Sequence, residues 1–244
     1  MNPAEYTRMF ENEDRYWWFV IRRELVLDQV RRFVRGPDPL IVDVGCGTGA
    51  TAAGLRRFGR VIGVDFSPLA LQACITRGLG ELLRARAEAI PLAGDSADAI
   101  VATDILEHLD DDLAALAEFR RILKPGGHAI ITVPAYQFLW SEHDLALMHR
   151  RRYVARQLGE RADCAGFRRV RLGYALSLLF PIALWRLLKG PRDDGKPPEA
   201  QIKPVPAWLN ATLIRFQRVE TMLFRYGSLP WGLSVVAVLQ KPAA

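Results

Sequence analysis

Residues 41–49 read Ile-Val-Asp-Val-Gly-Cys-Gly-Thr-Gly, a short apolar strand that runs directly into a glycine-spaced turn. The next apolar segment, residues 61–65, reads Val-Ile-Gly-Val-Asp and ends on an acid. Glycines let backbone N–H groups approach a ligand closely, and a carboxylate at the tip of the following strand can accept hydrogen bonds from two ribose hydroxyls. The two segments therefore predict a binding site for a cofactor that contains adenosine.

The spacing of the glycines distinguishes two classes of such cofactor. Dinucleotide sites have the spacing G-x-G-x-x-G, in which a helix N-terminus binds a pyrophosphate. Here Gly45, Gly47 and Gly49 give G-x-G-x-G, and Ala50 occupies the third dinucleotide position. This spacing favours a cofactor without phosphate. A tight strand-to-helix turn that binds nothing is the plainer alternative.

Strand and helix patterns alternate along the chain. This alternation indicates parallel strands joined by crossover helices, which is an α/β, doubly wound sheet. Residues 123–127, Leu-Lys-Pro-Gly-Gly, are typical of a helix end followed by a turn into a strand. The expected strands are 40–44, 60–64, 98–103, 128–133, 168–173 and 233–240, and the expected helices are 14–35, 49–58, 68–76, 111–123 and 154–164.

The connection between the last two expected strands is far longer than the few residues usual in a hairpin. It contains an apolar segment at 174–188, a charged linker at 190–206 and an amphipathic helix at 207–226. The uncharged run 172–185 is too short to span a bilayer, which takes roughly 20 residues. We therefore expect three parts: an N-terminal helical cap at 1–35, a cofactor-binding core at 36–173 plus 233–244, and a helical insertion at 174–232.

The formal net charge of +6 is unevenly distributed. Residues 149–171 contain only two acids, Glu160 and Asp163, against eight arginines. Such a stretch suits an anionic membrane surface or a phosphorylated substrate, and it is equally compatible with a solvated helix face. A nucleic-acid partner is not expected, because no recognition motif or interleaved stacking aromatics accompany the arginines. They are Arg150, Arg151, Arg152, Arg156, Arg161, Arg168, Arg169 and Arg171.

The three cysteines, Cys46, Cys74 and Cys164, are odd in number and widely spaced. They match neither a zinc-ligand pattern nor a disulfide framework, which favours a reduced, cytoplasmic setting. Residues 1–13 lack the charged-then-apolar layout of a secretory signal. A peripheral position at the inner face of the membrane is the alternative location.

Taken as a set, these motifs resemble those of the class I S-adenosylmethionine-dependent methyltransferases, the group that includes the ubiquinone- and sterol-type enzymes. The resemblance covers about residues 36–170: motif I at 42–49, the acid Asp65, the strand and its tip at 99–109, and the turn at 123–127. It implies a Rossmann-like, seven-stranded sheet with a C-terminal antiparallel hairpin, and S-adenosylmethionine as cofactor. The cofactor-binding residues that it implies are Asp43, Gly45, Cys46, Gly47, Asp65, Phe66, Ala87, Thr103, Asp104 and His108.

One position departs from the family pattern, which often reads Gly-Asp-Ala-Glu where residues 85–88 read Ala-Arg-Ala-Glu. Arg86 has no acceptor for the adenine amine, so the backbone N–H of Ala87 is the remaining candidate contact to the ring. The flanking segments 17–23, 140–153 and 229–234 are similar to those of a narrower group of bacterial methyltransferases. Members of that group often accompany glycosyltransferase and polyprenyl-lipid functions.

The loop 134–153 follows a strand of the expected sheet, and ligands in such sheets bind beyond the carboxyl ends of the strands. We therefore expect the loop to lie over the methyl group of the cofactor. Methyl transfer to oxygen needs a nucleophile without its proton, and a histidine can take that proton near neutral pH. The first candidate base is His143, with Asp144 or Glu142 nearby, ahead of His149. Proximity alone, without a base, is the alternative.

Asp104, Glu107 and His108 stand at i, i+3 and i+4, so on a helical turn they would share one face, as a metal site requires. Ubiquinone-type O-methyltransferases have a similar acid-x-x-Glu-His pattern. The same letters occur in relatives without a metal, where the turn contacts the cofactor and caps the following helix. We therefore expect no metal ion here.

The expected function is S-adenosylmethionine-dependent O-methylation of an amphipathic or lipid-linked small molecule. The insertion 174–232 would bind the lipid chain, with Arg168, Arg169 and Arg171 on phosphate, and an anionic membrane surface is a second expected partner. One alternative is a regulatory or scaffold protein of the same fold that binds S-adenosylmethionine without methylating. A nucleotide-dependent oxidoreductase is a further alternative, because fold alone does not determine function.

Overall fold

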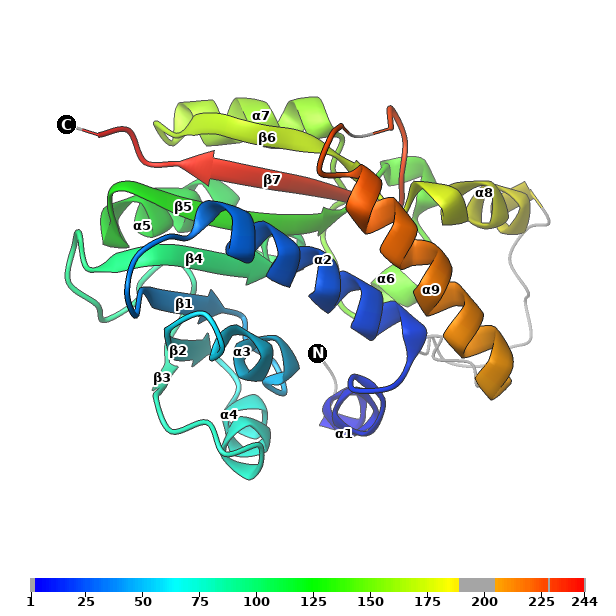
Figure 1. The fold of residues 1–244 in the computed structure, drawn as a ribbon, viewed down its shortest axis with the longest axis horizontal. Helices are drawn as coiled ribbons and strands as arrows, with labels where there is room; N and C mark the ends of the chain where they lie inside the picture. Colours follow the sequence, from blue (N-terminus) through cyan, green and yellow to red (C-terminus); the bar gives the residue numbers. More distant parts are fainter. Residues whose placement is uncertain (1–2, 189–204, 228, 244) are drawn as a thin grey trace.

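The computed structural model describes residues 3–188, 205–227 and 229–243, and its centre is a seven-stranded sheet (Figure 1). The strand order is β3-β2-β1-β4-β5-β7-β6. The first five strands are parallel, while β7 lies between β5 and β6 and is antiparallel to both. This confirms the expected fold class. The strands are β1 (Leu40–Val44), β2 (Arg60–Asp65), β3 (Leu82–Arg84), β4 (Ala97–Thr103), β5 (Leu123–Pro134), β6 (Arg168–Ala175) and β7 (Ser234–Gln240).

Helices cover both faces of the sheet, so the central strands are apolar on both sides. Successive residues of β1 enter different cores, since Ile41 packs with α2, α3 and α4 while Val42 packs with α5 and α7. This alternation follows from the two-residue period of a strand. The helices are α1 (Pro3–Asn12), α2 (Trp17–Phe33), α3 (Ala50–Leu55), α4 (Pro68–Thr76), α5 (Asp112–Ile122), α6 (Glu142–Ala146), α7 (Ala155–Cys164), α8 (Phe180–Leu188) and α9 (Ala207–Leu223), with 3-10 turns η1 (Leu106–His108), η2 (Gln137–Leu139) and η3 (Ser177–Leu179).

The N-terminal region differs from the expectation of one helix over 14–35. The structure has two helices, α1 and α2, separated by a turn at residues 13–16. Glu13 in this turn is buried and bonds to Thr48 and Arg77, which are remote in the sequence. The sequence pattern also missed β3, because this strand has only three residues and none of them is fully buried.

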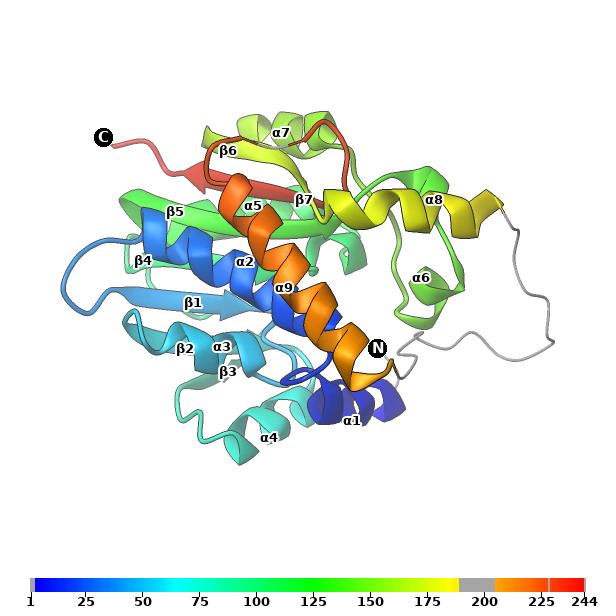
Figure 2. The same cartoon turned by 45° about the vertical axis from the view of Figure 1, so that its right-hand side comes forward.

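The insertion begins after β6 and returns through α9, which lies alongside α2 (Figures 1 and 2). Glu220 of α9 is buried, and its carboxylate accepts hydrogen bonds from the backbone N–H of Ser177 (2.7 Å) and of Leu178 (3.1 Å). A second attachment joins Arg218 to Glu24 of α2 at 2.6 Å. The expected linker at 190–206 lies, apart from its last two residues, outside the described residues.

All eight arginines of the basic stretch have partners within the chain. Two of them, Arg151 and Arg161, form ion pairs with the buried Asp112. The stretch therefore neutralises acids and holds carbonyl groups of the fold, which weakens the argument that these side chains bind phosphate. The other pairs are Arg150 with Asp110, Arg152 with Asp144, Arg156 with Glu160, Arg168 with Gln240, Arg169 with Asp163, and Arg171 with the carbonyls of Phe224 and Arg225.

The attachment of the insertion can be tested through Glu220. We expect Glu220→Ala to lower the free energy of unfolding in urea by about 1–3 kcal/mol, because it leaves buried N–H donors without an acceptor. The matched control is Glu24→Ala, which removes an exposed ion pair and should cost less than about 1 kcal/mol. Equal losses in the two variants would contradict this role of Glu220.

Candidate functional site

The glycine-spaced turn has the geometry that its sequence indicates. Gly45, Gly47 and Gly49 have φ angles of 72°, 54° and 88°, a left-handed region that side chains disfavour. The N–H groups of Gly45 and Cys46 donate to the carbonyl of Val64, at 2.8 and 3.0 Å. The turn after β1 is therefore bound to the end of β2, and α3 begins immediately after it.

Asp65 lies at the tip of β2, as expected, and holds the turn. One carboxylate oxygen accepts a hydrogen bond from the N–H of Gly47 at 2.9 Å, and the other accepts one from the N–H of Ser67 at 2.8 Å. Burial raises the pKa of this carboxyl above its usual value. Each oxygen can still accept a further hydrogen bond, so the group can serve ribose hydroxyls without releasing the backbone.

Asp43 is fully buried, and neither of its carboxylate oxygens has a hydrogen-bond partner among the described residues. Burial, together with the charges of Asp65 and Glu13, raises its pKa to about 7. Three carboxyl groups therefore surround the glycine turn. This arrangement suits a cationic ligand, and S-adenosylmethionine has both a sulfonium and an ammonium group.

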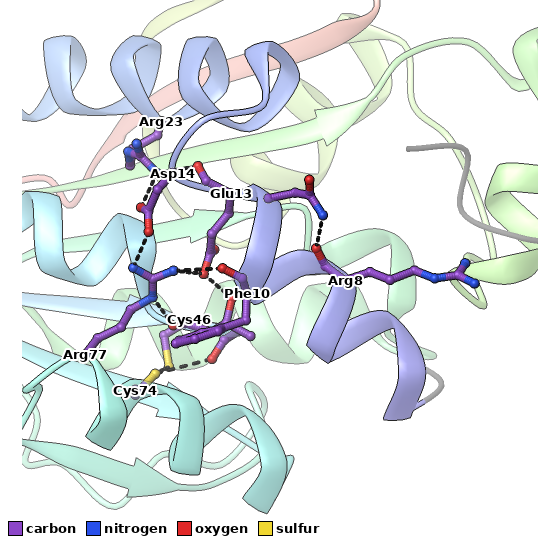
Figure 3. A network of polar contacts seen from close by, with 11 residues as sticks. Arg8, Phe10, Glu13, Asp14, Arg23, Cys46, Cys74 and Arg77 are labelled. Atoms are coloured by element: carbon purple, nitrogen blue, oxygen red, sulfur yellow. Dashed lines mark hydrogen bonds and ion pairs between the residues drawn. The ribbon is translucent and has the colours of Figure 1, made fainter. Parts of the chain in front are cut away.

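The segment around α1 is fastened over the turn by Arg77, which follows α4 (Figure 3). Its guanidinium donates to Glu13 and Asp14, both at 2.7 Å, and to the carbonyl of Thr48 at 2.8 Å. The Thr48 hydroxyl donates to Glu13. A Cβ atom on Gly47 would lie 2.8 Å from Met9, so α1 rests directly on the turn. Sequence reasoning missed these contacts, because no local pattern links Arg77 to residues 9–14.

The remaining expected cofactor residues lie at or near the same edge of the sheet. Asp104 follows Thr103 at the end of β4 with a φ of 51°, and such strained residues cluster at functional sites. Its carboxylate accepts the Thr132 hydroxyl at 3.2 Å and pairs with Arg22 of α2. Phe66 is 63% exposed beside Asp65, so its ring is accessible to a flat ligand.

Three further positions expected to contact the cofactor are described next. Ala87 is buried, while Arg86 is mostly exposed and pairs with Glu88 at 3.3 Å, so the arginine is directed away from the core. The thiol of Cys46 is buried, 3.7 Å from that of Cys74. His108 lies in η1, just beyond Asp104.

On the acceptor side, Asp144 orients His149 and not His143. The carboxylate of the fully buried Asp144 accepts a hydrogen bond from Nδ1 of His149 at 2.9 Å. It accepts two more from the guanidinium of Arg152, at 2.7 and 2.8 Å. Although burial opposes ionisation, the hydrogen bonds from His149 and Arg152 hold the pKa of Asp144 well below its usual range. Because an ionised carboxylate only accepts, Nδ1 of His149 is the protonated nitrogen and Nε2 is the basic one.

His143, the first candidate from the sequence, is in a different environment. Adjacent residues of a helix point in different directions, so His143 and Asp144 do not form a pair on α6. Burial lowers the pKa of His143 to about 4, against the opposing effect of Asp144. Its ring centre lies 6.4 Å from that of His149. The structure therefore favours His149 over His143 as the oriented base.

The turn η1 brings two more titratable groups next to His149. Nε2 of His149 is 4.0 Å from Glu107, and the His108 ring is 4.8 Å from the His149 ring. Ligand atoms of Glu107, His108 and His149 lie within 4.8 Å of one another, which is close enough to share a cation. Asp104 lies outside this group, because it faces Arg22 and Thr132. The absence of a metal ion stays a prediction.

Comparison with known proteins identifies a domain within the chain. Residues 42–131 match the model of a methyltransferase domain. The chain is 32% identical over 126 residues to a ubiquinone/menaquinone biosynthesis C-methyltransferase from Syntrophotalea carbinolica, covering 48% of this chain and 50% of that protein. It is 36% identical over 99 residues to a ubiquinone biosynthesis O-methyltransferase from Alkalilimnicola ehrlichii, covering 38% and 40%.

The chain thus spans about half the length, or less, of these curated relatives. Among solved structures, a S-adenosylmethionine-dependent methyltransferase from Thermotoga maritima superposes with a TM-score of 0.63 at 22% identity, covering 98% of this chain and 95% of that one. This likeness shows the fold, while the matched motifs show the kind of domain. The chain therefore contains a class I S-adenosylmethionine-dependent methyltransferase domain, with S-adenosylmethionine as its cofactor.

Proposed function

We propose that the protein methylates a hydroxyl group of an amphipathic or lipid-linked small molecule. The observation that most supports this proposal is the buried Asp144–His149 pair, which lies beside η1, the turn that follows β4. When bound, S-adenosylmethionine supplies the methyl group from its sulfonium and becomes the neutral thioether. The protein must then bind the acceptor in line with that methyl group and accept the proton of its hydroxyl.

His149 is suited to accept this proton. Asp144 holds its Nδ1–H, so Nε2 keeps the free lone pair, and only 6% of the side chain is exposed. As the O–CH₃ bond forms and the S–CH₃ bond breaks, the hydroxyl proton moves to Nε2. The resulting imidazolium is stabilised by Asp144, while the two hydrogen bonds from Arg152 keep that carboxylate ionised and in place.

Aromatic side chains of the loop 134–153, which we term the acceptor loop, and of its neighbours support an acceptor with an apolar part. The rings of Tyr136 and Tyr174 stack at 5.0 Å, and Phe180 meets Tyr136 edge-on at 5.5 Å. Phe138, half exposed, stacks on Tyr136 at 5.1 Å between ring centres. Tyr136 has a φ of 58°, so backbone strain contributes to the position of its ring. Such a cluster can bind a flat or aliphatic part of a substrate.

The part of the proposal that concerns binding of the methyl donor depends on Asp65. We expect Asp65→Ala to weaken binding of S-adenosylhomocysteine by about 1–3 kcal/mol, because ribose hydroxyls and the Gly47 N–H lose their acceptor. Isothermal titration calorimetry measures the effect. The control is Glu81→Ala, which removes an exposed carboxylate near the start of β3 that pairs with Arg60, and it should leave affinity unchanged. Unchanged affinity in Asp65→Ala would refute this placement of the ribose.

The acceptor half depends on His149. We expect His149→Ala to lower turnover of a labelled methyl donor by about 10²-fold while affinity for S-adenosylhomocysteine stays the same. The matched variant His143→Ala should have a smaller effect, because its imidazole lacks the orienting carboxylate. A larger loss in His143→Ala would reverse the assignment. If the wild-type protein binds S-adenosylhomocysteine but no acceptor is methylated from a lipid extract, the non-methylating alternative holds.

A further inference from the structure

The helix α8 is apolar and exposed around most of its circumference. Its residues read Phe-Pro-Ile-Ala-Leu-Trp-Arg-Leu-Leu, and it extends from the body of the molecule near α6 (Figure 2). Its packing contacts are mainly with η2 and η3. A helix with apolar residues on all sides is normally buried in a protein core or in lipid. The exposed residues are Pro181, Ile182, Leu184, Trp185, Leu187 and Leu188.

The outward side of α9 is also apolar. Residues of its inward side, among them Leu213, Gln217 and Glu220, are directed toward α2 and η3. The opposite side of α9 consists largely of apolar side chains that are nevertheless exposed. Tyr226, just beyond the helix, is exposed as well. Both α8 and α9 contact η3, and we term their exposed apolar side chains together the α8–α9 surface. Its members on α9 are Trp208, Phe216, Val219, Met222 and Leu223.

The described part of the insertion is poor in acids. Over the described residues 172–188, 205–227 and 229–243, the only acid is Glu220, and it is buried against Ser177 and Leu178. Arg215 is exposed within the apolar side of α9, and Arg218 is exposed beside it, paired with Glu24 of α2. Because Glu24 balances the charge of Arg218, Arg215 supplies the positive charge of the α8–α9 surface, which complements an anionic, apolar partner.

We propose that the α8–α9 surface docks on an anionic lipid bilayer. A second copy of this chain could cover one side of α8, whereas lipid can surround most of it. Trp185, Trp208 and Tyr226 are exposed, and such side chains favour the boundary between membrane and water. No helix in the described part of the chain has the length and hydropathy to cross a bilayer, so the contact is with the interface.

The inference rests on the proposed function in one respect, the route of the acceptor. Phe180, at the start of α8, contacts Tyr136 and Phe138 of the acceptor loop at 5.5 and 6.4 Å between ring centres. The docked helix is thus continuous with the aromatic cluster of Tyr136, Phe138 and Tyr174. A lipid-linked acceptor would enter from the bilayer along this path, and its hydroxyl-bearing part would enter the site first.

Vesicle flotation tests the docking without any acceptor. The intact chain should float with phosphatidylcholine vesicles that contain about one third phosphatidylglycerol, and less with pure phosphatidylcholine. Phe216→Asp/Met222→Asp on α9 and Leu184→Asp on α8 should each weaken flotation about tenfold or more, because they place acids on the docking surface. The matched control is Ile75→Asp, at a 56% exposed position on α4, and it should float like the wild type.

Three outcomes would overturn the proposal. The wild type could ignore both kinds of vesicle, or the control could lose binding as much as the docking variants. Light scattering could also show a dimer that Phe216→Asp/Met222→Asp dissociates, which would assign the surface to a second copy. S-adenosylhomocysteine affinity, measured in every variant, confirms folding.

If vesicle binding is lost in the docking variants but the protein methylates only a small soluble acceptor, the proposed substrate class fails while the docking stands.

Discussion

The two hydrogen bonds that Asp65 accepts, from Gly47 and from Ser67, are the constraint on which the donor side of the site depends. They hold a glycine turn in a left-handed conformation and connect it to the start of α4, so that β1, β2 and α4 meet at one point. Arg77, after the last turn of α4, then fastens the segment around α1 over the same turn. The glycine turn and the position of the N-terminal segment are therefore coupled through one carboxylate and one guanidinium.

Buried acids organise the acceptor side in a similar way. Asp144 binds His149, Arg152 and the N–H of Ser141, and Asp112 binds Arg161 and the hydroxyl of Tyr153. A buried carboxylate is costly without partners, so the arginines of 149–171 offset that cost. This explains why the most basic part of the chain is not a free cationic patch. Asp144 holds His149 in one orientation, whereas no carboxylate of the described residues hydrogen-bonds to His143.

The insertion has a different physical character. Its inner attachments are polar and specific, with Glu220 holding η3 and Arg225 pairing with Asp28 at 2.6 Å, whereas its outer side is apolar. A fold that needed the insertion only as a cover would bury these apolar groups or replace them with polar ones. The polar inner contacts therefore fix helices whose outer sides are apolar, and Phe180 at the start of α8 joins them to Tyr136 and Phe138.

The sequence by itself determined the alternating strands, the glycine turn, the acid Asp65 and the existence of an insertion, because these depend on periodicity and on spacing between near neighbours. It could not determine α1, β3, the partners of the arginines, or the choice of His149 over His143. Glu13 and Thr48 are separated by 35 residues, and Glu13 and Arg77 by 64, so their contact exists only after the sheet has formed. His143 and Asp144 are adjacent in sequence yet point in different directions on α6, whereas the loop after that helix returns His149 to the carboxylate. Local patterns predict which segments form strands and helices, and the tertiary packing alone decides which charged side chains are brought together.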